Sequence, residues 1–174
     1  VALSLFSGTI SSGQWSVLLD TKGLANGMQN FTFLTTDHAG NTHNTLFITA
    51  LVDNQAPSVV FNTPMIGANL TGIQFINATV IDALTSVSTV SFNLINSAGI
   101  TLLTLQGTNS GSNFYTTPLN TNGFSDGIYT IAAFANDTLG NINASENITV
   151  VIDTTAPQAS LELPRNNTFV STPS

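Results

Sequence analysis

Residues 119–141 read LNTNGFSDGIYTIAAFANDTLGN, and this stretch contains the clearest secondary-structure signal in the chain. Four residues in its middle, Tyr129, Ile131, Ala133 and Ala135, fall on one face of an extended chain. Gly and Asn or Asp flank this alternation, and these residues favour tight turns. The stretch therefore predicts a β-strand over residues 128–136 that turns one face toward a core.

The same features recur earlier in the chain at a constant spacing. Asp37-His-Ala-Gly-Asn41 matches Asp137-Thr-Leu-Gly-Asn141, and the two copies are offset by 100 positions. Gly23 with Gly123, and Asp53 with Asp153, keep the same offset without a gap. About 16 of the 74 pairs of residues in this register are identical. The chain therefore contains an internal repeat with a period of about 100 residues.

The phase of the repeat predicts the domain organisation. Residues 56–154 are expected to form a complete unit, and residues 1–54 the C-terminal half of a preceding one. Residues 157–174 match the first strand region of a following unit. Because residues 1–54 lack the first strands of their unit, we expect either more chain upstream or strands donated by another chain, and we favour the former.

Six further strands are expected in the complete unit, since each segment is short, rich in β-branched and aromatic residues and bounded by turn residues. They are 59–62, 73–82, 88–95, 100–105, 113–117 and 147–153. No window shows helical spacing with helix-forming residues. Seven short strands in about 100 residues predict an all-β fold, an immunoglobulin-like β-sandwich in tandem.

Composition excludes several classes of function. The 174 residues include two Lys and Arg, nine Asp and Glu, and no Cys. Two cations are too few to neutralise a run of phosphates, which argues against nucleic-acid binding. No apolar run is long enough to span a bilayer, so no membrane insertion is expected in this segment. The absence of Cys excludes disulfides and Cys-ligated zinc.

The links between units are short. Asp53-Asn-Gln-Ala-Pro57 and Asp153-Thr-Thr-Ala-Pro157 each contain a proline, which fixes its own φ and favours extended geometry in the preceding residue. Semi-rigid inter-domain linkers are therefore expected at Asp53, Pro57, Asp153 and Pro157, with consecutive sandwiches stacked end to end.

The combination of Asp-x-x-Ala-Pro, residues 119–130, residues 135–141 and Ile-Thr-Val-Val-Ile-Asp (148–153) resembles the tandem bacterial and archaeal Ig-like repeats of large extracellular surface proteins. The resemblance covers essentially the whole chain. It implies a β-sandwich and an extracellular or cell-surface location. This chain departs from the family in carrying almost no Lys or Arg.

Candidate modification sites are seven Asn-x-Ser/Thr sequences, at Asn30, Asn69, Asn77, Asn136, Asn143, Asn147 and Asn166. Roughly five would arise by chance in so polar a chain, so the count alone decides little. Four of them, Asn30, Asn77, Asn136 and Asn147, are expected on outward strand faces, where a glycan has room.

Candidate metal ligands are Asp37, Asp53, Asp82, Asp137 and Asp153, which could gather near the ends of units and bind calcium. No run of acids resembles a calcium loop, and we favour a turn-capping role for the Asp-x-x-Gly-Asn motif. No other cofactor is expected.

The sequence does not favour a histidine site, a catalytic carboxylate pair or a crosslink. His38 and His43 lie near Asp37, but the repeat has Thr138 and Asn143 at their positions, so solvated histidines are expected. Asp126 and Asp137 are a conceivable carboxylate pair, but both recur in turns and are therefore expected to be structural. Lys22 aligns with Asn122 in a turn, which argues against an isopeptide crosslink.

These patterns predict a non-enzymatic, extracellular structural protein that forms a stalk, filament or surface coat and associates with itself. Leu34, Phe134 and Val151 are expected outward apolar positions for lateral packing. The alternative is an adhesin or carbohydrate-binding module of a larger secreted protein, with a glycan or host-surface ligand. A third class is an accessory region of a secreted hydrolase.

Overall fold

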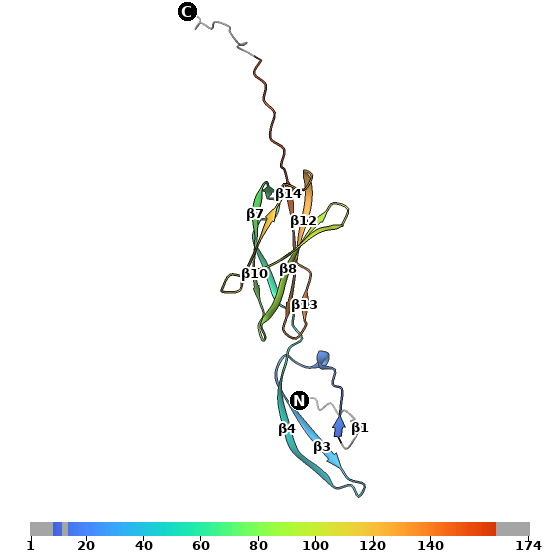
Figure 1. The fold of residues 1–174 in the computed structure, drawn as a ribbon. Helices are drawn as coiled ribbons and strands as arrows, with labels where there is room; N and C mark the ends of the chain where they lie inside the picture. The colour runs from blue at the N-terminus through green and yellow to red at the C-terminus, as the bar shows by residue number, and fades with distance from the viewer. Residues whose placement is uncertain (1–8, 12–13, 163–174) are drawn as a thin grey trace, which may run out of the picture.

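The computed structural model describes residues 9–11 and 14–162. In this part of the chain the regular structure consists of β-strands and one short 3-10 helix, and there is no α-helix. Figure 1 shows an elongated molecule, in which a two-layered sandwich lies between a long hairpin and an extended C-terminal segment. The prediction of an all-β fold is confirmed.

Two sheets make up the sandwich. The strands of the four-stranded sheet follow the order β10-β11-β7-β5, and the second sheet follows β6-β14-β12-β8-β9 with β13 attached to β12. The first sheet contains β5 (Ser58–Thr63), β7 (Ile73–Ile81), β10 (Thr108–Asn109) and β11 (Phe114–Asn120). The second contains β6 (Asn69–Leu70), β8 (Val87–Asn96), β9 (Thr101–Gln106), β12 (Gly127–Asp137), β13 (Ile142–Asn143) and β14 (Asn147–Ile152). This arrangement is the predicted Ig-like β-sandwich.

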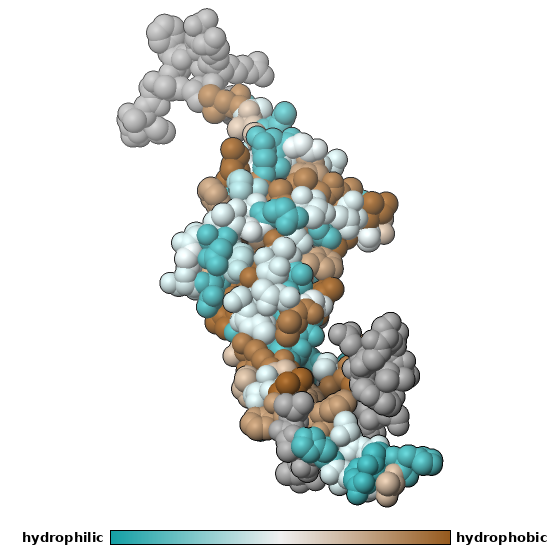
Figure 2. Space-filling view, turned by 60° about the horizontal axis from the view of Figure 1, so that its bottom comes forward, coloured by the Kyte–Doolittle hydropathy of each residue, from teal (hydrophilic) through white to brown (hydrophobic). Residues whose placement is uncertain are grey.

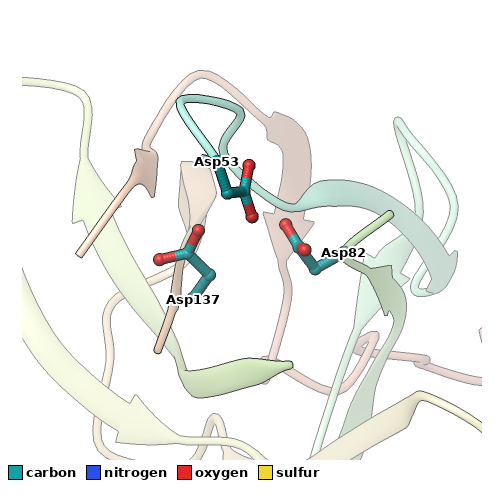
Figure 3. Close-up of side chains that lie close together, drawn as sticks. All are labelled: Asp53, Asp82 and Asp137. Atoms are coloured by element: carbon teal, nitrogen blue, oxygen red, sulfur yellow. The ribbon is translucent and has the colours of Figure 1, made fainter. Parts of the chain in front are cut away.

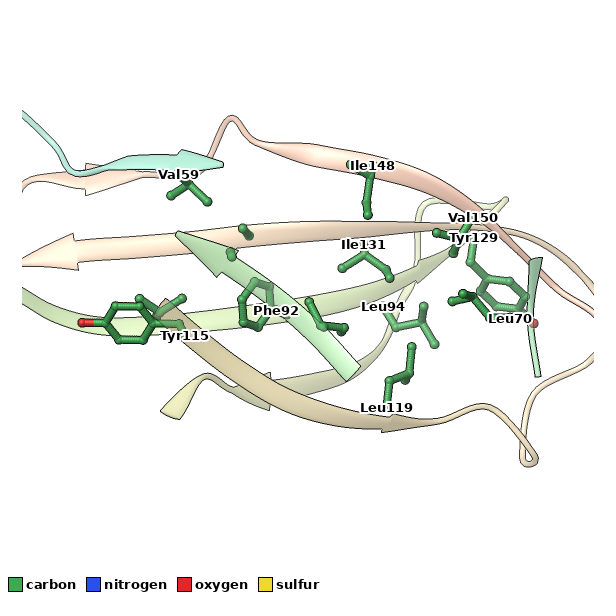
Figure 4. Packing of buried hydrophobic residues seen from close by; sticks show 14 of the residues in the cluster. Val59, Leu70, Phe92, Leu94, Tyr115, Leu119, Tyr129, Ile131, Ile148 and Val150 are labelled. Carbon is green, nitrogen blue, oxygen red and sulfur yellow. The ribbon is translucent and has the colours of Figure 1, made fainter. Parts of the chain in front are cut away.

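The core lies between the two sheets, and β12 supplies its centre. β12 pairs antiparallel with both β8 and β14. Its predicted inner residues, Tyr129, Ile131, Ala133 and Ala135, are at most 7% exposed. They belong to one cluster with residues of the facing sheet, among them Val59, Ile76, Tyr115 and Leu119 (Figure 4). Burial of this apolar surface is the dominant force that holds the sheets together.

The first part of the chain forms two hairpins. They are built from β1 (Thr9–Ser11), β2 (Gln14–Ser16), β3 (Gly27–Thr36) and β4 (Thr42–Val52), with the 3-10 helix η1 (Thr21–Gly23) between them. The register of β3 with β4 repeats that of β12 with β14: Phe31 pairs with Ile48, and Ile131 pairs with Ile148. The internal repeat of the sequence is therefore also a repeat of strand pairing.

All seven strands expected in the complete unit are present, with bounds shifted by a few residues. β6, β10 and β13 were not expected, because each is two residues long and has no alternation to detect. Within the described residues, no helix has the length and apolar character needed to cross a membrane.

Candidate functional site

Residues 53–57 connect β4 to β5 and form the joint between the β3–β4 hairpin and the sandwich. Asn54 ties this joint to the preceding part of the chain. Its backbone N–H donates to Asn26 Oδ1 at 2.9 Å, and its Nδ2 donates to the carbonyl of Thr21 at 2.8 Å.

The sandwich holds the same joint from the other side. Asn141 Nδ2 donates to the carbonyl of Asp53 at 3.0 Å, and Asn143 Nδ2 donates to the carbonyl of Pro57 at 2.9 Å. Because both acceptors are backbone carbonyls, these bonds restrict the path of the chain and not only its side chains. The joint is therefore hydrogen-bonded to the structures on both sides of it.

Three carboxylates meet at this joint. Asp53 follows β4, Asp82 follows β7 and Asp137 ends β12, and one oxygen of each lies within 4.8 Å of the other two (Figure 3). Asp53 is 6% exposed and Asp137 is 1% exposed, whereas Asp82 is partly buried. One of the three carboxylates thus comes from the preceding unit and two come from the following one.

Backbone and side-chain donors satisfy most of these oxygens. Asp137 Oδ1 accepts from the N–H groups of Leu139 and Asn141, and its Oδ2 accepts from Asn141 Nδ2 at 2.7 Å. Asp53 Oδ1 accepts from the N–H of Gln55. The predicted turn-capping role of the Asp-x-x-Gly-Asn motif is therefore confirmed at Asp137.

One of the remaining oxygens, Asp82 Oδ2, lacks a donor among the described residues. Asp82 Oδ1 accepts from the N–H groups of Leu84 and Thr85. Thr85 Oγ1 lies 3.0 Å from both Asp82 Oδ1 and Asp53 Oδ2, so its single proton can serve Asp53 Oδ2. Asp82 Oδ2 is buried and has no hydrogen-bond partner in the described structure. Buried anionic oxygens without donors are costly unless a cation or a proton compensates them.

The geometry suits a hard divalent cation. Calcium binds oxygen ligands at about 2.3–2.6 Å, so two ligands on opposite sides of one ion are roughly 5 Å apart. The 4.8 Å limit on the separations of the three carboxylate oxygens is within this distance. Calcium bound by Asp53, Asp82 and Asp137 would draw ligands from both sides of the joint.

Hydrogen bonding keeps Asp137 ionised. Burial acts most strongly and raises its pKa, but the hydrogen bonds from Asn141, Leu139 and Gly140 together outweigh burial and lower the pKa below the ordinary value of 3.8. Asp137 is therefore an anion at neutral pH, as a cation ligand must be.

The other predicted metal ligands lie elsewhere. Asp37 caps its own turn through Ala39 and Asn41, and it is exposed. Hydrogen bonds, chiefly from the Asn41 side chain, lower the pKa of Asp37. Asp153 is the repeat equivalent of Asp53 and accepts from the N–H of Thr155. Of the five expected aspartates, only Asp53, Asp82 and Asp137 converge within the described part of the chain.

The second linker repeats part of the first joint. Asp126 Oδ1 accepts from the N–H of Thr154 at 2.7 Å, as Asn26 Oδ1 accepts from Asn54. Hydrogen bonds from Thr154 and Thr155 lower the pKa of Asp126, with the Thr154 N–H as the largest cause. Pro157 follows in the exposed, extended segment that leaves the sandwich.

The structure separates the other candidate residues. Asp126 precedes β12 and Asp137 ends it, so roughly 30 Å or more of strand lies between them. A glycosidase pair requires carboxylates within about 10 Å, so these two residues cannot form one. His38 and His43 are exposed and do not join the carboxylate cluster.

The Asn-x-Ser/Thr asparagines fall into two groups. Asn30, Asn69 and Asn147 are exposed, whereas Asn77, Asn136 and Asn143 are partly buried. Asn77 Nδ2 donates to Thr63 Oγ1, Asn136 Oδ1 accepts from Thr89, and Asn143 holds Pro57. Asn166 lies outside the described residues.

Sequence reasoning missed the side chains that hold the joint. Asn26, Asn141 and Asn143 belong to segments that were recognised as turns or sequons, but their partners lie 28 or more positions away in the chain. It also missed the bond from Tyr129 Oη to the carbonyl of Ser125 at 2.8 Å, which resembles the tyrosine corner of Ig-like sandwiches. Gln29 Nε2 donates an equivalent bond to the carbonyl of Ala25 at 3.0 Å. The alignment of Gln29 with Tyr129 in the repeat was therefore the sequence signal that could have revealed this bond.

Comparison with solved structures shows the fold. The endo-beta-1,4-mannanase from Thermotoga petrophila aligns with a TM-score of 0.50 and 16% identity over 59% of this chain. This chain spans only 21% of that enzyme. The fibronectin(III)-like modules of CbhA from Clostridium thermocellum align with a TM-score of 0.41 and 20% identity, over 76% of this chain and 64% of theirs. Identities this low carry no information about activity.

Comparison of the sequence identifies the family. No curated protein matches the chain. The profile of the family described as bacterial Ig-like domain (group 3) matches residues 13–120, which is more than half of the 174 residues. The match runs from the first hairpins, across the joint, to the end of β11. The chain therefore belongs to the bacterial Ig-like domain family, group 3.

Proposed function

We propose that this chain is a segment of an extracellular or cell-surface structural protein, in which tandem Ig-like units form a stalk, filament or surface coat. The observation that carries the proposal is the joint at residues 53–57, where side chains on both sides bond to the connecting backbone. A joint held in this way transmits force along the chain without acting as a free hinge. The bond from the Thr154 N–H to Asp126 repeats one side of this joint at the next linker.

The cellular role is tested by imaging. Antibodies against residues 56–154 should label the surface of intact cells of the organism that makes the protein, in a layer or along filaments. Labelling that requires permeabilised cells would contradict the proposal.

A calcium ion at Asp53, Asp82 and Asp137 is part of this proposal. The supporting observation is the buried, partnerless Asp82 Oδ2 beside two buried carboxylates. The ion would join the end of β4 to the ends of β7 and β12, and so stiffen the joint. It would also compensate charge in a chain with few cations of its own.

Calcium binding is tested on the full chain by titration calorimetry and thermal unfolding in CaCl2 and in EGTA. We expect a higher melting temperature with calcium, because a ligand that binds only the folded state stabilises it. Asp82→Asn should abolish the calcium-dependent shift. Glu162→Gln removes the same charge from the exposed tail and should leave the shift intact. A melt that chelator does not change would leave the carboxylates with a turn-forming role only.

Self-association and glycosylation complete the proposal. Low charge leaves little long-range repulsion between copies, and Leu34 is 52% exposed while Phe134 and Val151 are partly buried. Glycans on exposed sequons such as Asn30, Asn69 and Asn147 would solubilise such a surface. An intact mass of native protein equal to that of the bare polypeptide would overturn glycosylation.

An adhesive or carbohydrate-binding module is the second candidate. A hollow of about 430 Å³ lies at one end of the sandwich, lined in part by Asn96, Phe124 and Asp126. Tyr129 also lines it, but the residue is only 7% exposed and its hydroxyl is bonded, so it offers no free stacking face. Binding of residues 56–154 on a glycan array would favour this role.

A further inference from the structure

The β3–β4 hairpin has an open apolar face. Phe33 is 46% exposed and Ile48 is 67% exposed. Their repeat equivalents on β12 and β14, Ala133 and Ile148, are 0% and 9% exposed. Figure 2 shows apolar side chains at the surface of this end of the molecule as well as on the sandwich.

Outward positions of the two hairpins differ less uniformly than these inward ones. Met28 and Ile128 occupy an outward position of the repeat, and they are 66% and 61% exposed. Leu34 is 52% exposed whereas Phe134 is partly buried, so the outer faces match only in part. The exposure of Phe33 and Ile48 is a loss of cover on the inner face of β3–β4. The inner face of β3–β4 lacks a facing sheet, although the register of its two strands matches that of β12 with β14.

The edge of β3 is open as well. β12 pairs with β14 on one side and with β8 on the other, whereas β3 pairs only with β4 in the described structure. An unpaired edge beside an exposed apolar face is a template for another strand. The repeat identifies that strand as one with the pattern of β8, backed by a sheet with the pattern of β5 and β7.

We propose that β3 and β4 belong to a second Ig-like sandwich, completed by an upstream segment of the same polypeptide that has the strand pattern of residues 56–100. A second copy of the chain does not meet this need, because the inward residues of its β5, β7 and β8 are already packed in its own core. Its residues 157–174 match only the first strand region. This inference rests on the repeat and on the exposed face, and it holds with or without calcium at the joint.

The upstream segment must be complementary to this hairpin and not identical to residues 56–100. In the sandwich, Ala133 pairs with Phe92, and both are 0% exposed. The hairpin has Phe33 in place of Ala133. A Phe33–Phe pair would place more volume at this position than the Ala133–Phe92 pair of the filled sandwich core, so the strand beside β3 should carry a small residue where β8 has Phe92.

The test extends the full chain. A copy of residues 56–100 placed directly before Val1 continues the repeat in register, because residue 101 is equivalent to residue 1. One version carries Phe92→Ala in the added copy, and another keeps Phe92. The matched control carries Leu94→Asp in the added copy together with Phe92→Ala. The readouts are amide hydrogen exchange in β3, binding of an apolar dye, and the oligomeric state of the unextended chain by sedimentation.

We expect the Phe92→Ala extension to slow exchange of the edge amides of β3 by about tenfold or more and to reduce dye binding. The extension that keeps Phe92 should protect β3 less, and the Leu94→Asp control should not protect it. Unchanged exchange in every extended chain would overturn the proposal. Concentration-dependent protection of β3 in the unextended chain would also overturn it, in favour of a second copy as the occupant.

Discussion

Asp137 shows how one residue serves both the local turn and the joint. Its two oxygens accept three hydrogen bonds from the turn that follows β12, and the same carboxylate faces Asp53 and Asp82. It is 1% exposed, so its partners in the protein replace nearly all contact with water. The equivalent Asp37 makes the same turn bonds in an exposed position, which provides a natural control.

Asp137→Asn should lower the free energy of unfolding of the sandwich by about 1–3 kcal/mol. The reason is that an amide NH2 placed at Oδ2 would face the Asn141 Nδ2 donor. Urea denaturation of the full chain measures this loss. Asp37→Asn should change the unfolding of the sandwich much less, and equal effects would contradict a special role for the buried copy.

The pH dependence follows from the same residue. The pKa of folded Asp137 is below 3.8, so its ionised form stabilises the fold above its unfolded pKa. This contribution is lost as pH falls through the folded pKa. We expect the free energy of unfolding of the natural chain to decrease at pH values below about 4. That of Asp137→Asn should decrease less steeply over the same range. Parallel pH profiles of unfolding free energy for the two proteins, measured by urea denaturation, would show that Asp137 is not the source of this pH dependence.

At the scale of elements, the joint depends on short strands and turns that reach across it. β13 is only two residues long, yet Asn143 at its end donates to the carbonyl of Pro57. Asn141, in the turn before β13, donates to Asp53. The turn between β12 and β13 thus connects the sandwich to the linker that precedes it by more than 80 residues.

Asn143→Ala should loosen the linker and lower the free energy of unfolding by about 1 kcal/mol, since the Pro57 carbonyl loses a partly buried donor. Amide hydrogen exchange at residues 53–59 should accelerate. Asn69→Ala provides the matched control, because Asn69 is exposed in β6 and also belongs to a sequon. Equal acceleration in both variants would show that the Asn143 bond does not restrain the linker.

At the scale of the whole molecule, the two halves differ in how much core they contain. The sandwich encloses one continuous cluster of buried apolar residues, with Phe92 at 0% exposure and in contact with Phe61 at a ring distance of 5.9 Å. Among the residues whose side chains the structure describes, the first hairpins contribute none to that cluster. Their stability therefore depends on the joint and on whatever covers the inner face of β3–β4.

A fragment of residues 56–154 should unfold cooperatively on heating, whereas residues 1–54 should not. The reason is that an isolated hairpin with one open face buries too little apolar surface to offset its conformational entropy. Circular dichroism melts of the two fragments check this expectation. A cooperative melt of residues 1–54 would contradict the strand assignment.

Phe92→Ala in the longer fragment should lower its free energy of unfolding by about 3–5 kcal/mol, because the vacated volume cannot be refilled by its neighbours.

The repeat, the alternation of β12 and the turn at Asp137 were readable from the sequence, because each depends on residues close together in the chain. Alternation reports which side of a strand is buried, and the Asp-x-x-Gly-Asn motif bonds within five positions. The all-β fold followed from these local patterns. β6 and β13 were not readable, since two residues carry no period.

Only the tertiary structure determined which aspartates meet. Five were candidates from the sequence, but the pairing of β7 and β12 with their neighbours brings Asp82 and Asp137 to Asp53 and leaves Asp37 and Asp153 apart. The hydrogen bonds from Asn141 and Asn143 to the linker also join residues far apart in the chain, so they too depend on the tertiary structure. Strand pattern specifies the faces of each strand, whereas contacts between strand ends depend on sheet order and register, which no local spacing encodes.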